Sequence, residues 1–134
     1  MDCATVSQIP VSLPASILRR ARAAERKHPD ALVAILSAEG LFLYNSASSE
    51  EILGYPPGYA LGHNITEFYQ PREAAHIMLT IHDALLAGES TTTTRNSPLA
   101  KGGTRRIRGS MYRVVDPTSG VAYALSVAWP ATSS

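Results

Sequence analysis

Two histidines in one helical segment are the first residues whose chemistry could serve a ligand. The segment 71–87 begins with Pro71 and is followed by Gly88, which is typical of a helix with both ends marked. His82 is expected to face the interior, where it is either a satisfied core histidine or a polar anchor for a ligand, whereas His76 is expected on the wet side. The apolar face of this helix is predicted to contain Ala74, Met78, Ile81 and Leu85.

Catalytic groups are not predicted. The adjacent residues Glu50 and Glu51 point to different sides of a helix, so they cannot act together as an acid and a base. The one cysteine, Cys3, precedes the predicted elements, which excludes a thiolate metal cluster or a Cys/His pair in the core. No glycine loop followed by Lys-Ser or Lys-Thr could hold a phosphate. We therefore expect that the protein is not an enzyme.

Basic residues cluster in the segment 101–113. Tyr112 lies among them, as aromatic residues do on nucleic-acid platforms. The formal net charge of the chain is only +1, however, and strand alternation predicts a solvated face whose charges prevent edge pairing. We expect this face to be solvent-exposed, with a protein partner as the alternative and no direct contact with nucleic acid. The cluster consists of Lys101, Arg105, Arg106, Arg108 and Arg113.

The composition predicts one folded domain in a reducing compartment. The chain has 134 residues, of which 45% are hydrophobic and 17% are charged. No apolar run reaches the length of a membrane span, and the N-terminal segment lacks the features of a signal peptide. We expect a cytoplasmic protein without membrane contact, with residues 1–13 as a flexible leader.

The order of predicted elements is a helix, two strands, short helices, a longer helix and three strands. A helix with a narrow apolar stripe spans 14–28, and the first hairpin joins 31–37 to 41–45. Short helical pieces follow, interrupted by glycines and prolines, before the helix at 71–87. The final strand, 121–129, carries no charge on either face, so both of its faces are expected to be covered.

This order resembles that of PAS domains, and particular residues strengthen the resemblance. AEGLFLYN (38–45) is similar to the family's acidic-Gly turn and following strand, and a Gly-Tyr and the Gly62-His63-Asn64 sequence follow it. LLAGES (85–90) and KGGT (101–104) resemble the family's helix end and a later turn. The resemblance implies an α+β fold with a five-stranded antiparallel sheet, helices on one face and an N-terminal capping helix. It assigns 31–129 to the domain and 130–134 to a tail.

The sequence bears on two cofactors that PAS domains bind, flavin and haem. Flavin-binding photosensory members carry a cysteine after the Gly-x-Asn, but Ile65 stands there, so no covalent flavin adduct can form. Haem-binding members take an axial histidine from the long helix and a distal arginine, which Arg95 could imitate. The helix face favours His82, whereas the family position lies nearer His76, so haem is kept only as an alternative and the cofactor stays unassigned.

The resemblance implies a sensory module of a signal-transduction protein, such as a histidine kinase or a transcription regulator. It would bind a small, mostly apolar ligand in a cavity between the long helix and the sheet, and form a homodimer through the N-terminal helix and the sheet face. The alternative is a ligand-free dimerisation module. No effector domain is recognised in the sequence, and the family's Asp-Ile-Thr output motif is replaced after Trp129. The predicted ligand-binding residues are Tyr69, Met78, His82, Leu85, Arg95, Met111, Tyr123 and Leu125.

Overall fold

The computed structural model describes residues 13–89 and 93–131. Its helices are α2 (Ala15–Lys27), α3 (Ser49–Leu53), the 3₁₀ helix η1 (Ile65–Phe68) and α4 (Pro71–Ala87). Its strands are β1 (Leu32–Leu36), β2 (Phe42–Asn45), β3 (Thr93–Pro98), β4 (Thr104–Val115) and β5 (Ala122–Pro130). Of the predicted leader only Leu13 lies within the described residues, and Cys3 lies outside them. The predicted tail begins inside β5.

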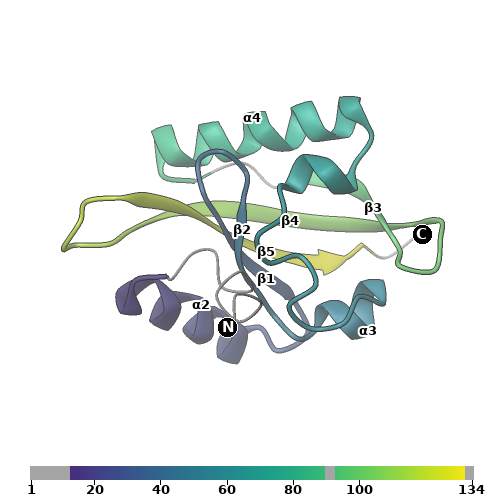
Figure 1. Ribbon diagram of the computed structural model, residues 1–134, viewed down its shortest axis with the longest axis horizontal. Helices are drawn as coiled ribbons and strands as arrows, with labels where there is room; N and C mark the ends of the chain where they lie inside the picture. The colour runs from purple at the N-terminus through teal and green to yellow at the C-terminus, as the bar shows by residue number, and fades with distance from the viewer. Residues whose placement is uncertain (1–12, 90–92, 132–134) are drawn as a thin grey trace, which may run out of the picture.

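The five strands form one antiparallel sheet in the order β2-β1-β5-β4-β3. The N-terminal helix α2 and the long helix α4 lie on opposite faces of this sheet (Figure 1). The predicted α+β architecture, with a capping N-terminal helix, is therefore confirmed. In the part of the chain that the structure describes, no helix has the length and apolar character needed to cross a membrane.

Proline and glycine define the ends of the helices. Pro71 is the first residue of α4, where its missing N–H costs no helical hydrogen bond. Gly88 ends the helix with a φ of 97°, a left-handed conformation that suits glycine, and its N–H donates to the carbonyl of Ala84. Asn64 caps η1, because its side chain accepts a hydrogen bond from the N–H of Thr66. These local signals place η1 and α4 beside the sheet.

An apolar core fills the space between α2 and the sheet. Ile17 and Ala21 of α2 are fully buried there, against Val33 and Ile35 of β1. The narrow apolar stripe predicted for this helix is thus used to cover the sheet of its own chain. From the remaining strands the core includes Val114, Leu125 and Val127.

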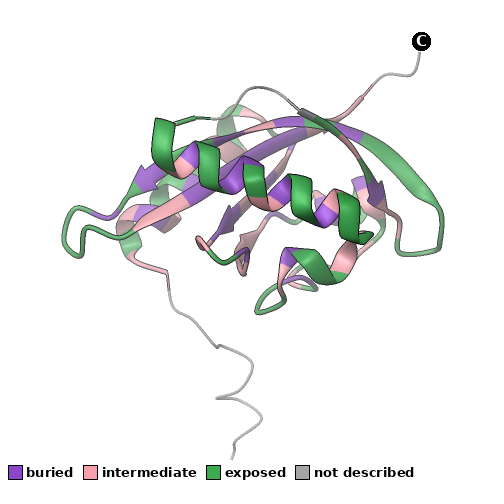
Figure 2. Cartoon of the chain, turned by 90° about the horizontal axis from the view of Figure 1, so that it is seen from above, coloured by how far each residue is buried: buried purple, intermediate pink, exposed green. Residues whose placement is uncertain are grey.

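A second core lies beneath α4. Figure 2 shows the helix from above, with buried positions along its sheet side and exposed positions on its outer surface. The buried face is centred on Ile77, Ile81 and Ala84, and Met78 and Leu85 lie at its edge. The sheet contributes Leu36, Met111 and Ala124 to this core, and η1 contributes Ile65. Apolar side chains therefore fill the space where the sequence predicted a cavity.

Two polar contacts attach α2 to the strands beneath it. The hydroxyl of Tyr44 donates a hydrogen bond to Glu25. Burial and this hydrogen bond raise the pKa of Tyr44 to about 12, so its phenol stays protonated at neutral pH. At the start of the helix, Ser16 Oγ donates to Asp116 Oδ1 over 2.6 Å. Because Asp116 directly follows β4, both ends of α2 are fastened to the sheet.

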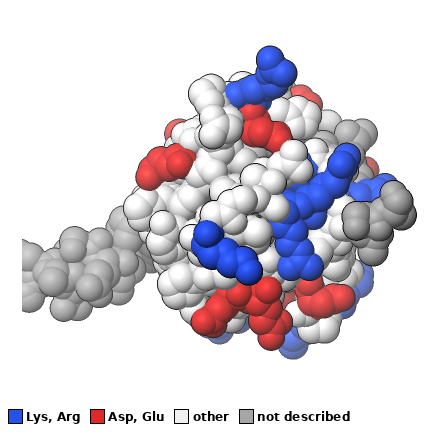
Figure 3. Space-filling view, turned by 90° about the vertical axis from the view of Figure 1, so that its right-hand side faces the viewer, with Lys and Arg blue, Asp and Glu red and all other residues white. Residues whose placement is uncertain are grey.

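The basic residues of β4 lie at the solvent-exposed surface, as predicted. Arg106 and Arg108 are exposed, and Arg113 donates from Nη1 to the carbonyl of Leu85 over 3.0 Å. Figure 3 shows the end of the molecule on the right-hand side of Figure 1, where basic and acidic side chains are interspersed. The visible surface there therefore does not form a large patch of one sign.

Substituting Gly109 with alanine should destabilise the fold. A Cβ at this position would lie 2.5 Å from the Cβ of Ala128 and 2.6 Å from the carbonyl oxygen of Val127, both on the neighbouring strand β5. Overpacking of this kind lowers the free energy of unfolding by roughly 1–3 kcal/mol. The measurement is chemical denaturation of Gly109→Ala beside Arg108→Ala, an exposed neighbour whose change should stay within about 0.5 kcal/mol. Equal midpoints for the two variants would contradict the close strand approach.

The contribution of Asp116 to stability should depend on pH. Hydrogen bonds from Ser16 and Ser119 hold the pKa of the Asp116 carboxyl below its ordinary value. A lowered folded-state pKa stabilises the fold above the unfolded value, about 3.9, and this contribution disappears as the pH falls through the folded value. Asp116→Asn should therefore be less stable than the natural chain at pH 7, and the gap should narrow below about pH 4.

Thermal unfolding from pH 7 to pH 2.5 measures this gap. Asp83→Asn is the matched control, because Asp83 is an exposed carboxyl on α4, away from α2. A gap for Asp116→Asn that stays constant down to the lowest pH would show that the ionised carboxylate does not stabilise the attachment of α2.

Candidate functional site

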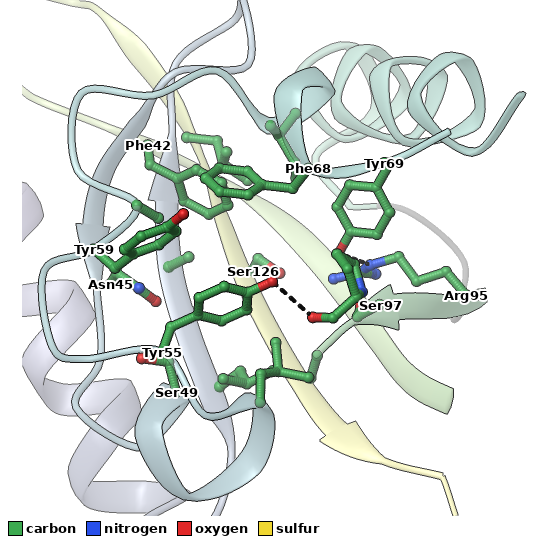
Figure 4. Close-up of a pocket in the computed structure, with 18 residues that line it drawn as sticks. Phe42, Asn45, Ser49, Tyr55, Tyr59, Phe68, Tyr69, Arg95, Ser97 and Ser126 are labelled. Carbon is green, nitrogen blue, oxygen red and sulfur yellow. Dashed lines mark hydrogen bonds between the residues drawn. The ribbon is translucent and has the colours of Figure 1, made fainter. Parts of the chain in front are cut away.

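A pocket of about 80 Å³ lies on the α4 side of the sheet, beside the long helix and not beneath it. Its floor is formed by β1 and β5, through Ala34, Leu36, Ser126 and Ala128. Residues of β2, α3, η1 and β3 make its walls (Figure 4). The short helical segments between β2 and α4 thus stand away from the sheet and leave a space that is partly open to solvent.

Aromatic rings form the largest part of the wall. The ring centroids of Tyr55 and Tyr59 are 4.8 Å apart in a stacked arrangement, and Phe68 lies edge-on to Phe42 at 5.9 Å. Gly54 ends α3 with a φ of 88° and turns the chain so that the segment carrying these tyrosines folds over the sheet. Such rings offer flat apolar surfaces to a ligand.

A polar group of residues lies on the β3 side of the pocket. The hydroxyls of Tyr69 and Ser97 are 2.8 Å apart, and Arg95 Nε donates to the Tyr69 hydroxyl over 3.4 Å. The Tyr55 hydroxyl donates to the carbonyl of Pro98 over 3.1 Å. Burial, followed by the neighbouring Tyr59 and Tyr69, raises the pKa of Tyr55.

The hydroxyl of Ser49 is a buried polar group beside the pocket and is closed to solvent. This residue borders the pocket and only 3% of it is exposed. Its Oγ has no hydrogen-bond partner among residues 13–89 and 93–131. A buried hydroxyl without a hydrogen-bond partner lowers the free energy of unfolding by roughly 1–3 kcal/mol relative to a hydrogen-bonded one. Asn45 places its side-chain amide on the same side of the pocket (Figure 4).

The structure places two of the eight predicted ligand-binding residues, Tyr69 and Arg95, on the pocket wall. Met78, Leu85 and Met111 belong instead to the core beneath α4. Tyr123 and Leu125 belong to the core on the opposite face, beneath α2.

The prediction that His82 faces the interior is wrong, because this residue is exposed on the outer surface of α4. The expected face contained Ala74, Met78, Ile81 and Leu85. At 100° per residue the buried face is rotated from it by about 65° toward Ile77 and Ala84. Leu79, which shares the outer surface with His82, is 62% exposed.

The residues present do not fit a haem. His76 and His82 are both exposed on α4, so neither can supply an axial ligand inside the pocket. The pocket, at about 80 Å³, is also far smaller than a porphyrin would need. Among the described residues, no cluster of three or more His, Cys, Asp or Glu side chains is placed to hold a metal ion.

Several pocket residues were missed by sequence reasoning, including Phe42, Ser49, Tyr55 and Phe68. The sequence did contain a signal for this aromatic wall. The segment 55–69, which is made of short turns, contains four aromatic residues. Aromatic residues in such a segment must find an apolar surface to cover, and the nearest one is the uncharged inner face of β1 and β5.

Comparison with solved structures finds the same arrangement of strands and helices elsewhere. No protein-family model matches the sequence, and no curated protein matches it either. A PAS domain from Colwellia psychrerythraea is 19% identical, with a TM-score of 0.69, over 87% of this chain and 98% of that one. The PAS-B domain of Drosophila melanogaster Cycle with bound ethylene glycol is 14% identical, with a TM-score of 0.65, over 75% of this chain and 99% of that one.

A third structure, VqmA bound to DPO, is 15% identical with a TM-score of 0.64 and matches over 83% of this chain and 56% of that one. At these identities the likeness concerns the fold alone. The chain therefore has the PAS fold.

Proposed function

We propose that this chain is the sensory module of a signal-transduction protein, such as a histidine kinase or a transcription regulator, and that it binds a small, mostly apolar molecule in the pocket. The observation that carries the proposal is a partly open pocket whose apolar and aromatic lining includes a few placed polar groups, Arg95, Tyr69 and Ser97. Apolar pockets with a few placed polar groups are the usual form of small-molecule sites. Two of the similar structures contain a bound small molecule, ethylene glycol in one and DPO in the other.

The two central strands offer a route from the pocket to α2. On β1, Ala34 lines the pocket while its neighbours Val33 and Ile35 pack under α2. On β5, Ser126 lines the pocket while Leu125 packs under α2. Because successive side chains of a strand point to opposite faces, a ligand that shifts these strands also shifts the surface on which α2 rests. Occupancy would then favour one packing of α2 over another.

Dimerisation through the N-terminal helix and the sheet face stays a prediction. In the structure the buried stripe of α2, including Ile17 and Ala21, covers the sheet of its own chain. A homodimer at this place would have to exchange α2 between two chains or use the exposed side of the helix. Light scattering coupled to size exclusion measures the oligomeric state directly.

Filling the pocket from its floor should abolish binding. Ser126 is 6% exposed and borders the pocket, so the larger side chain in Ser126→Leu would occupy the ligand space. Titration of the labelled natural chain with benzyl alcohol, a neutral one-ring probe, should shift the NMR amide signals of pocket residues such as Asn45 and Ser49. In Ser126→Leu we expect the affinity to fall by roughly ten-fold or more, since each tenfold loss corresponds to about 1.4 kcal/mol of contacts.

Ala122→Leu is the matched control for this experiment. Ala122 lies on the same strand and half-buried, but it does not border the pocket, so benzyl alcohol binding should be retained. Thermal unfolding of both variants shows that each is folded. Shifts scattered over the surface, or equal affinities for Ser126→Leu and the natural chain, would contradict a ligand site at this pocket.

A further inference from the structure

The charge on the described lining of the pocket is positive and not balanced by a carboxylate. Among the described residues that line it, Arg95 is the only one with a charged side chain, and no aspartate or glutamate contributes. A cationic ligand would therefore meet a like charge and no carboxylate. An anionic ligand would meet a guanidinium in a partly desolvated site, where opposite charges attract more strongly than in water.

The guanidinium of Arg95 has N–H donors that are available to a ligand. This residue is half-buried, and its Nε donates to Tyr69 over a long 3.4 Å. Within residues 13–89 and 93–131 it makes no ion pair with a carboxylate. A guanidinium carries five N–H donors in a planar fork that matches the two oxygens of a carboxylate. The part of Arg95 that faces the pocket is thus suited to a bidentate anion.

A second, neutral polar group lies across the pocket from Arg95. Figure 4 shows Arg95 and Ser97 on one side and Asn45 and Ser49 on the other, with aromatic rings between them. Asn45 places its side-chain amide on this second side. The pocket thus has a cationic end, an apolar middle and a neutral hydrogen-bonding end.

We infer that the ligand is a one-ring aromatic monoanion, whose carboxylate pairs with Arg95 and whose ring lies between the aromatic walls. The pocket has a volume of about 80 Å³ and opens partly to solvent, so a single aromatic ring is a suitable size of probe for it. This inference rests on the proposed function, because it assigns the chemistry of the ligand in the same pocket.

Benzoate and benzamide test the charge preference on the natural chain, because the two have nearly the same shape and only benzoate is charged. Isothermal titration should show that benzoate binds roughly ten-fold or more tightly than benzamide, as expected for a hydrogen-bonded charge pair. In Arg95→Gln this difference should disappear while benzamide binding stays unchanged. Arg106→Gln, which removes an exposed charge outside the pocket, should keep the preference for benzoate.

The outcomes separate this inference from the proposed function. If benzyl alcohol and benzamide bind at the pocket as tightly as benzoate, the anion preference is overturned and the ligand site remains. If Arg95→Gln keeps the preference for benzoate, the assignment of Arg95 is overturned. If neither the charged nor the neutral probes bind, both proposals fail.

Discussion

The burial of β1 and β5 on both faces is the constraint on which the remaining structure depends. Residues Ala124 to Ala128 of β5 are all buried, and β1 beside it has no charged side chain. Such strands are stable only if something covers each face, because exposed apolar surface is unfavourable in water at about 25 cal/mol per Å². Helix α2 covers one face, and α4 together with the short helices covers the other.

Side chains fill the space on one face of the sheet more completely than on the other. Beneath α2 and α4 the core is filled with branched apolar side chains such as Ile17 and Ile81. Beneath the segment from α3 to η1, small residues on the strands, including Ala34 and Ser126, leave room that the aromatic walls do not fill. The pocket is thus a consequence of small side chains on the floor and large flat ones on the wall, and the same two strands connect it to α2.

The polar atoms of the pocket are not explained by stability. A half-buried guanidinium at Arg95 lowers the stability of the empty protein compared with an apolar residue of similar shape. Natural proteins accept such local violations mainly where a ligand or partner resolves them. This is the physical ground on which binding is favoured over a purely structural role for the domain.

The orientation of α4 shows the limit of reasoning from periodicity. The proline at its start and the glycine at its end were sufficient to predict its bounds, because they act through the local backbone. Its buried face was predicted about 65° away from the true one, since alanines and isoleucines occur around much of the helix and several apolar stripes were possible. Contact with the sheet selected one of them and left His82 exposed, which removed the strongest sequence-based candidate for a ligand anchor.

The sequence by itself therefore determined the order of the elements, the double burial of the last strand and the similarity to the PAS fold, since these follow from local backbone preferences and from strand alternation. Only the tertiary structure decided where the cavity lies and which residues line it. The wall brings together β2, α3, η1 and β3, which are separated along the chain, and Tyr69 meets Ser97 across 28 positions. Contacts between such distant segments depend on how each element rotates and packs, and that information is not contained in the pattern of any single segment.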